Sequence, residues 1–146
     1  MKFTRIAPAF VVVLSGMVAA LHVGKIPPAI PVLREALGLT LVEAGFLLSM
    51  VQMAGMVAGL FVGVATDSIG RRRSVISGQS ILAIASLCGM WAQRPADLLV
   101  LRAFEGLGFL LTVLPAPSLI RQSVPLGKLT LYLGLWGTYM PTGTSL

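Results

Sequence analysis

The sequence predicts an all-α membrane protein built from several transmembrane helices. Of its 146 residues, 56% are hydrophobic and only 11% are charged, whereas soluble proteins carry about 25% charged residues. The apolar residues are grouped in stretches of about 20, the length that a helix needs to cross a bilayer. The net charge of +6 lies at the ends of these stretches, so it does not indicate nucleic-acid binding. The single cysteine excludes a disulfide framework.

Five membrane spans account for the apolar stretches. After the first span, Pro27, Pro28 and Pro31 are expected to break the helix or to force a kinked exit from the membrane. Pro115 and Pro117 are expected to kink the fourth span, where neighbouring helices can satisfy the freed carbonyl groups. The spans cover approximately residues 6–23, 41–66, 75–92, 98–120 and 129–146.

The cations predict the orientation of the chain. With a cytoplasmic N-terminus, seven cations are cytoplasmic and three are external, which agrees with the positive-inside rule. The start of the chain also resembles a signal peptide, but its apolar core is long and no small-x-small cleavage site precedes Pro27. We therefore expect a retained first span and a multi-pass protein of a bacterial inner membrane. The cytoplasmic cations are Lys2, Arg5, Arg71, Arg72, Arg73, Arg121 and Lys128, and the external ones are Lys25, Arg34 and Arg94.

The loop between the second and third spans concentrates charge next to glycine. Gly63, Asp67 and Gly70 precede three consecutive arginines, Arg71, Arg72 and Arg73. Gly70 is expected to allow the backbone to reverse direction. The arginines are explained equally well by topology alone, because a positive inner loop holds the orientation.

Glycines recur every four residues in the second span. Gly55, Gly59 and Gly63 stay near one face of the helix, drifting by about 40° at each step, and small residues let another helix approach closely. Ordinary helix packing with no moving part explains the glycines alone. Asp67 continues the series, and its carboxylate can bond to the amides at the N-terminus of a neighbouring helix or pair with an arginine in its own loop.

The fourth span contains two ionisable residues. An arginine at the centre of a span costs about 2.5–3.5 kcal/mol to insert, and intramembrane ionisable residues usually mark a functional site. Arg102 and Glu105 are three residues apart and therefore share a helix face. We expect them to line a cavity where Arg102 attracts an anion or biases a proton on Glu105. The alternative is a mutually neutralising pair that stabilises packing, next to the small packing residues Gly106 and Gly108.

His22 and Lys25 lie near the expected outer end of the first span. The imidazole can titrate near neutral pH, although a histidine near the interface is more often solvated. The lysine can extend its ammonium group outward to water. It can also line the outer mouth of a cavity and attract anions, so both residues are candidates for a substrate or proton site.

Two of these segments resemble the major facilitator superfamily. The segment 63–73 resembles the signature loop that joins the second and third helices of these transporters, except that Ser68 stands where a basic residue often follows the aspartate. The segment 98–108 is similar to a fourth-helix pattern of arginine, a polar residue three positions on and then glycine, with Glu105 where glutamine is common. The overall amino-acid sequence of the five spans also resembles that of cyanate- and nitrate-type carriers.

The resemblance implies a fold and a mechanism. Superfamily members bind substrate between two six-helix halves, which rock to expose the site to each side in turn. It implies that Asp67 and its loop brace the cytoplasmic gate against the second half. We then expect a partial N-terminal half with about five of roughly twelve helices. Such a chain needs the missing half or a partner subunit and does not transport alone.

The predicted function is transport of a small solute, for which the cationic Lys25 and Arg102 favour an anion and Glu105 allows proton coupling. No cofactor or metal is expected. The main alternative is a non-transporting scaffold or assembly subunit, in which the glycine face binds a partner helix permanently. A membrane-embedded enzyme is a further alternative, but the chain has one histidine, one cysteine and no acids at ligand spacing, so we expect no enzyme.

Overall fold

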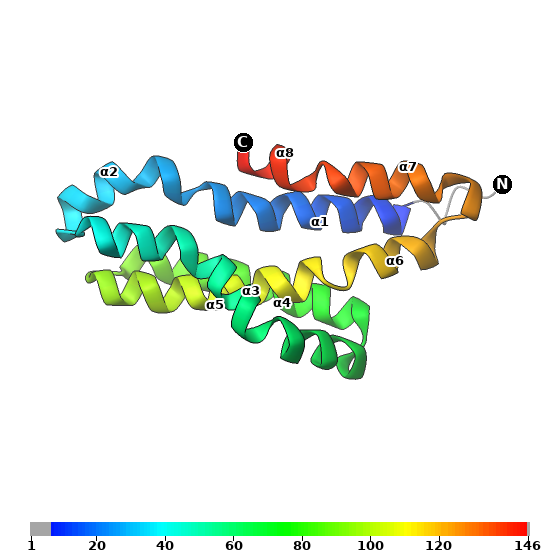
Figure 1. The fold of residues 1–146 in the computed structure, drawn as a ribbon, viewed down its shortest axis with the longest axis horizontal. Helices are drawn as coiled ribbons and strands as arrows, with labels where there is room; N and C mark the ends of the chain where they lie inside the picture. Colours follow the sequence, from blue (N-terminus) through cyan, green and yellow to red (C-terminus); the bar gives the residue numbers. More distant parts are fainter. Residues whose placement is uncertain (1–6, 146) are drawn as a thin grey trace.

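The computed structural model describes residues 7–145 and contains helices and no strands within that range (Figure 1). The predicted all-α architecture is therefore confirmed. The cations at positions 2 and 5, the first residue of the predicted span 6–23 and the last residue of 129–146 lie outside the described part. The helices are α1 (Ala7–Gly24), α2 (Ile26–Leu37), α3 (Leu41–Ile69), α4 (Arg71–Cys88), α5 (Pro95–Val113), α6 (Ala116–Ser123), α7 (Leu126–Gly137) and α8 (Tyr139–Ser145), with a 3₁₀ turn at Gly89–Trp91.

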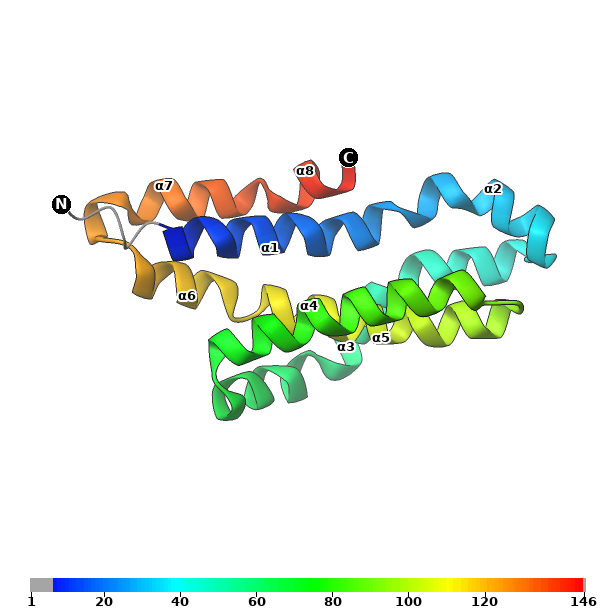
Figure 2. The same ribbon diagram turned by 180° about the vertical axis from the view of Figure 1, so that it is seen from behind.

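The helices form two groups. Helix α1 runs alongside α7 and α8, whereas α3, α4 and α5 pack on one another, and both views show this separation (Figures 1 and 2). Helix α6 continues the direction of α5 and carries the chain from the second group to the first. The most extensive helix contacts are those of α4 with α5, α3 with α5 and α1 with α8. Segments that are distant in sequence are thus brought together around α1 and α5.

Four helical stretches of the described chain are long and apolar enough to cross a membrane: Pro8–Leu37, Leu41–Ile69, Arg71–Trp91 and Pro95–Ser123. The region of the predicted fifth span forms α7 and α8, which are separated at Thr138 and are each shorter than 18 residues, so it is not among these four stretches. Helix α3 alone has 29 residues, or about 43 Å at 1.5 Å per residue, which exceeds the apolar core of a bilayer.

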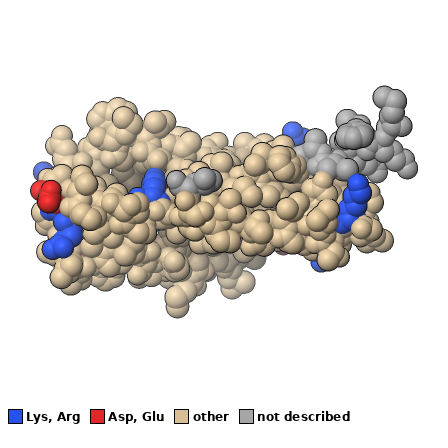
Figure 3. Space-filling model, turned by 90° about the horizontal axis from the view of Figure 1, so that it is seen from above, with Lys and Arg blue, Asp and Glu red and all other residues tan. Residues whose placement is uncertain are grey.

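The outer surface of the bundle is apolar, as expected for contact with lipid. On α3, the side chains of Met56 and Leu60 are 87% and 78% exposed. Figure 3 shows one face of the molecule, where uncharged residues cover most of the length and most of the visible charged side chains lie toward the two ends. This distribution suits an integral membrane protein, because charge is costly in the apolar core of the bilayer.

The prolines after α1 coincide with an interruption of the helix at Lys25, but they do not end the helical stretch, which continues to Leu37. Pro27 and Pro28 occupy the first turn of α2, and Pro31 lies inside it. Proline is tolerated in a first turn because the N–H groups there have no partner within the helix. Only the turn at Lys25 separates α1 from α2.

Two glycines and a capping box form the tight connections. Gly38 follows α2 with φ of +65°. At the start of α3, the Thr40 hydroxyl accepts a hydrogen bond from the Glu43 backbone N–H (3.2 Å), and the Glu43 carboxylate accepts one from the Thr40 N–H (2.9 Å). Gly70 joins α3 to α4 with φ of +95°, a conformation that glycine adopts without strain. The chain therefore reverses direction within one residue.

Candidate functional site

A buried ionic cluster lies where α1, α4 and α5 meet. Helix α5 supplies Arg102 and Glu105, which are 2% and 4% exposed. Their side chains are in contact, with the Arg102 Nη1 donating to Glu105 Oε2 at 2.6 Å. The one-turn spacing predicted from the sequence therefore brings the two groups together, and the surrounding helices remove both from solvent.

The guanidinium group of Arg102 is held mainly by backbone carbonyl groups. Its Nε donates to the carbonyl of Leu47 on α3 at 3.2 Å, and its Nη2 donates to the carbonyl of Val23 on α1 at 3.2 Å. Its Nη1 also donates to the carbonyl of His22. Four of the five N–H groups of a guanidinium are thereby used, and Arg102 fastens α1 and α3 to α5.

The prolines of α2 explain why a carbonyl group of α1 is free to accept. In a continuous helix, the carbonyl of Val23 would accept from the N–H of the residue at position 27. Pro27 has no N–H, so this acceptor needs another donor, and an unpaired buried carbonyl is unfavourable. The guanidinium of Arg102 supplies that donor. Pro27 and Arg102 are 75 residues apart in sequence, but both determine how the carbonyl of Val23 is satisfied where α1 meets α2.

Lys25 completes the cluster from the turn between α1 and α2. Its Nζ donates to Glu105 Oε1, to the Ser86 hydroxyl of α4 at 3.0 Å and to His22 Nδ1 at 3.3 Å. The imidazole of His22 also lies 3.6 Å from Glu105 Oε1. The sequence predicted that His22 and Lys25 lie near the outer end of the first span. Because α2 extends the first helical stretch to residue 37, both residues lie near its middle instead.

The cluster borders a cavity of about 280 Å³. Lys25, Ser86, Arg102 and Glu105 form its polar part, and apolar side chains from α2, α3, α4 and α5 form the rest. The two cations exceed the single carboxylate by one charge when His22 is neutral. Such a site can hold charge, exchange a proton or orient a small polar solute. Sequence reasoning missed Ser86, because nothing in the local spacing distinguishes it from the other serines of its helix.

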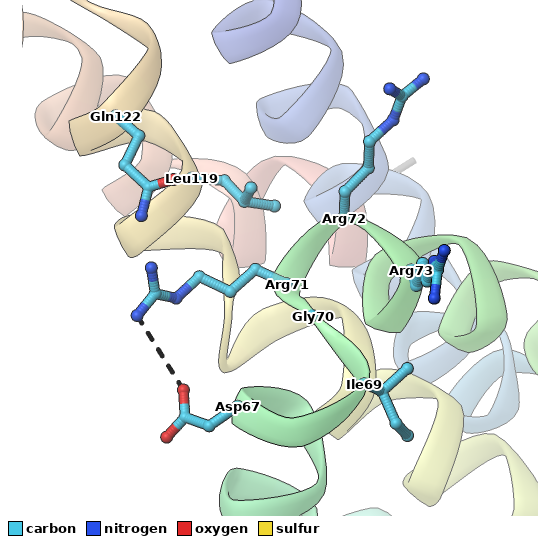
Figure 4. Close-up of a pocket in the computed structure, with 8 residues that line it drawn as sticks. All are labelled: Asp67, Ile69, Gly70, Arg71, Arg72, Arg73, Leu119 and Gln122. Carbon is cyan, nitrogen blue, oxygen red and sulfur yellow. Dashed lines mark ion pairs between the residues drawn. The ribbon is translucent and has the colours of Figure 1, made fainter.

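The charged loop lies at the opposite end of α3, away from the cluster. Asp67 Oδ1 and Arg71 Nη2 are 3.9 Å apart, and their side chains are 75% and 41% exposed. The two side chains point toward each other across a cleft of about 500 Å³, whereas Arg72 and Arg73 point to other sides (Figure 4). Of the two arrangements predicted for Asp67, the structure contains the pairing with an arginine of its own loop.

Helix α6 forms the other wall of this cleft. Its residues Leu119 and Gln122 face the loop (Figure 4). Sequence reasoning did not include them, because Leu119 is 46 residues from Arg73 in sequence and no local pattern links the two segments. The arrangement can hold an anionic group or a polar side chain from another helix.

The glycines divide into closely packed and open positions. A Cβ atom at Gly106 would lie 2.7 Å from the Cβ of Ala54 on α3, and one at Gly108 would lie 2.8 Å from the carbonyl oxygen of Gly78 on α4. These two glycines permit close helix contacts within the second group. On α3, a Cβ at Gly55 would contact, among the described residues, only the Leu110 side chain at 3.8 Å.

A Cβ atom at Gly59 or Gly63 would have no atom within 4 Å among the described residues. The close approach predicted at this end of the glycine stripe is therefore not made by the described part of the chain, and it remains a prediction about a helix from elsewhere. Within residues 7–145, no group of three or more histidine, cysteine or acidic residues is placed to hold a metal ion.

Comparisons with known proteins identify the family. A model of the Major Facilitator Superfamily matches residues 9–146. The chain is 25% identical over 134 residues to an uncharacterized MFS-type transporter of Methanocaldococcus jannaschii, and the match covers 92% of this chain and 35% of the relative. The chain thus spans about a third of the length of that curated relative. No solved structure gives a significant match. With its apolar helices and a family match over nearly its whole length, this chain is an integral membrane protein of the Major Facilitator Superfamily.

Proposed function

We propose that the chain is the N-terminal part of a secondary transporter that moves a small solute by alternating access. The buried cluster of Arg102, Glu105, Lys25 and His22 carries this proposal. Four ionisable groups are gathered inside an apolar helix bundle, and three of them, Lys25, Arg102 and Glu105, line a cavity. Burying such groups in a membrane protein is costly, and they usually mark substrate or proton pathways.

The proposed orientation places the N-terminus and the 67–73 loop in the cytoplasm. The excess of arginine and lysine on that side supports it. In this orientation, the segment from Gly63 to Arg73 forms part of the cytoplasmic gate. The exposed pairing of Asp67 with Arg71 is suited to this role, because a weak surface pair can exchange its partner at low energetic cost. A bacterial inner membrane remains the expected location.

A small anion is the proposed substrate class. Arg102 is nearly enclosed and already donates to carbonyls and to Glu105. The Lys25 side chain is 36% exposed, so we assign the first contact with an anion to Lys25. Proton coupling is part of the proposal, because carboxylate and imidazole groups share the site. The comparisons give no support for the finer assignment to cyanate- and nitrate-type carriers.

Transport requires the remainder of a carrier, supplied by a longer protein or by a partner subunit. The curated relative is about three times as long as the matched segment, and two halves must enclose the substrate for alternating access. We therefore propose that these 146 residues do not transport on their own.

Reconstitution into liposomes tests the proposal. The 146-residue chain and the longest protein encoded by the reading frame that contains it are assayed for uptake of radiolabelled small anions under an imposed pH gradient. We expect uptake by the longer protein, a loss of that uptake in Lys25→Met and no uptake by the 146-residue chain. Uptake by the 146-residue chain, or uptake unaffected by Lys25→Met, would contradict the proposal.

The exposed face of α3 favours a second candidate, a scaffold that binds a partner helix permanently. Gly59 and Gly63 are open, and the neighbouring Leu60 and Phe61 are 78% and 74% exposed. A scaffold would retain its function when Arg102 and Glu105 are replaced together by apolar residues. A transporter would lose its activity with the same double replacement.

A further inference from the structure

The two oxygens of the Glu105 carboxylate have unequal partners. Oε2 accepts from Arg102 Nη1 at 2.6 Å, and that arginine is fixed by three backbone carbonyls. Oε1 accepts from Lys25 Nζ, and His22 Nδ1 lies only 3.6 Å from the same oxygen. Two nitrogen groups therefore compete for one carboxylate oxygen.

The contact between Lys25 and His22 determines the present state of the imidazole. The ammonium group has only donors, so the His22 Nδ1 at 3.3 Å must be the acceptor. We therefore assign to this contact the neutral tautomer with its proton on Nε2, in which Nδ1 can accept. A proton added at Nδ1 would remove this acceptor and place two positive charges beside each other. Glu105 Oε1 lies 3.6 Å from Nδ1 and can accept from the new N–H.

Only one of the two cations that contact Glu105 has room to leave. Arg102 is 2% exposed, and moving it would leave the carbonyls of α1 and α3 without a donor. Lys25 is at a turn, its side chain is 36% exposed, and it borders the cavity of about 280 Å³. Repulsion from a protonated imidazole would therefore be relieved by a rotation of the Lys25 side chain toward the cavity.

We propose that His22 is a proton-binding site, and that its protonation exchanges Lys25 for His22 as the partner of Glu105 Oε1 and releases the Lys25 ammonium group into the cavity. The charged groups facing His22 are Lys25 at the end of its own helix and Glu105 and Arg102 on α5. Helix α4 contributes the hydroxyl of Ser86, and α3 contributes the carbonyl of Leu47, which holds Arg102. Within the described residues, no other charged group lies within 4.0 Å of the Glu105 carboxylate.

The exchange would couple proton binding to anion binding during the proposed transport. This coupling is the one part of the inference that rests on the proposed function. An ammonium group that has left its carboxylate is available to an anion in the cavity. Proton binding at His22 would then raise the affinity for the anion, and by reciprocity the anion would raise the affinity for the proton. The two would move together, as in proton–anion symport.

The exchange itself is tested without any transport measurement. His22 is the single histidine of the chain, so ¹⁵N-histidine labelling in lipid nanodiscs gives one imidazole to follow by NMR between pH 5 and 8. We expect a neutral Nε2–H tautomer at the upper end and protonation within the range. An imidazole that stays neutral throughout, or that carries its neutral-state proton on Nδ1, would overturn the proposal.

The chemical accessibility of Lys25 tests the second part of the exchange, the release of its ammonium group into the cavity. Brief labelling with an amine-reactive reagent, quantified by mass spectrometry, compares Lys25 with Lys128 in the same sample, which corrects for the intrinsic effect of pH on amines. We expect the Lys25/Lys128 labelling ratio to rise severalfold on acidification, with the midpoint of the His22 titration. In His22→Gln, whose amide can still accept from Lys25 but cannot titrate, the ratio should stay constant.

A ratio that rises equally in His22→Gln, or that is constant in the wild-type chain, would refute the exchange. The exchange can occur while a carrier containing this chain shows no pH-dependent anion uptake. That result would contradict the coupling and the proposed transport, but it would support the proton site at His22. The two failures are therefore distinguishable.

Discussion

Glu105 and Asp67 each contact an arginine that is three or four residues away in sequence, yet their surroundings differ completely. The side chain of Glu105 is 5% exposed and contacts Arg102 and Lys25, and its Oε1 lies 3.6 Å from His22 Nδ1. Asp67 is 75% exposed and lies 3.9 Å from Arg71. Buried ion pairs are costly to disrupt, whereas exposed pairs contribute about 0–1 kcal/mol. Two ion pairs of short sequence separation thus belong to a fixed contact between helices in one region and to an exchangeable surface contact in the other.

Removing the carboxylate of the buried cluster should have the largest effect. Glu105→Ala leaves Arg102 and Lys25 inside the bundle without a counter-charge, which we expect to lower the free energy of unfolding by about 3–5 kcal/mol. Denaturant unfolding in detergent micelles measures the loss. Asp67→Ala is the matched control and should change stability by less than about 1 kcal/mol. Equal effects of the two substitutions would remove the distinction between the regions.

Arg102→Lys tests whether geometry or charge matters in the cluster. Lysine keeps the positive charge but lacks the planar fork that reaches the carbonyls of Leu47 and Val23. We expect a loss of about 1.5–3 kcal/mol in the free energy of unfolding, because hydrogen bonds from a charged donor are broken. A normal stability in Arg102→Lys would show that the charge alone is sufficient.

Pro27→Ala should partly compensate for Arg102→Lys. Alanine at position 27 restores the N–H that the carbonyl of Val23 would bond in a regular helix. The double variant should therefore lose less stability than the sum of the two single variants, as measured by a double-mutant cycle. Strict additivity would show that proline and arginine do not serve a common joint.

Glycine substitutions compare the packed and open regions directly. A Cβ at Gly78 would lie 2.6 Å from both the carbonyl oxygen of Gly108 and the hydroxyl oxygen of Thr112, so Gly78→Ala should destabilise the fold by about 1–3 kcal/mol through overpacking. Gly59 is open in the described structure, and Gly59→Ala should stabilise α3 by about 0.5–1 kcal/mol. Thermal unfolding of both variants checks the difference, and a neutral Gly78→Ala would contradict the close α4–α5 contact.

The smallest effect on stability is expected from Asp67→Asn. An exposed substitution of this kind should alter the free energy of unfolding by no more than about 0.5 kcal/mol. Uptake by a carrier containing the chain should nevertheless fall, because the gate loses its charge. The exchange variant Asp67→Arg with Arg71→Asp restores the local pair. If it also restores uptake, Asp67 acts only through Arg71, and if it does not, Asp67 faces another helix.

The local part of this structure could be predicted from the sequence. Apolar stretches indicate helices because the bilayer permits little else, and the three-residue spacing of Arg102 and Glu105 places them on one face. The interruption expected at the prolines after the first span is confined to the turn at Lys25, because proline is tolerated in a first helical turn. The contacts of Lys25 with Ser86 and with Glu105 join residues that are 61 and 80 positions apart in sequence, and no local pattern encodes them.

The pairing of α1 with α8 has a consequence for the order of events during biosynthesis. Gly24 lies against the backbone of Thr144, where an added Cβ would be 2.7 Å from a Cα atom. The ribosome reaches Thr144 120 residues after Gly24, a delay of roughly 6–24 s at about 5–20 residues per second. Helices α4 and α5, which are adjacent in sequence, can dock as soon as both have entered the bilayer. Helix α1 thus waits longer for α8 than α4 waits for α5, and the face of α1 that packs on α8 is uncovered during that interval.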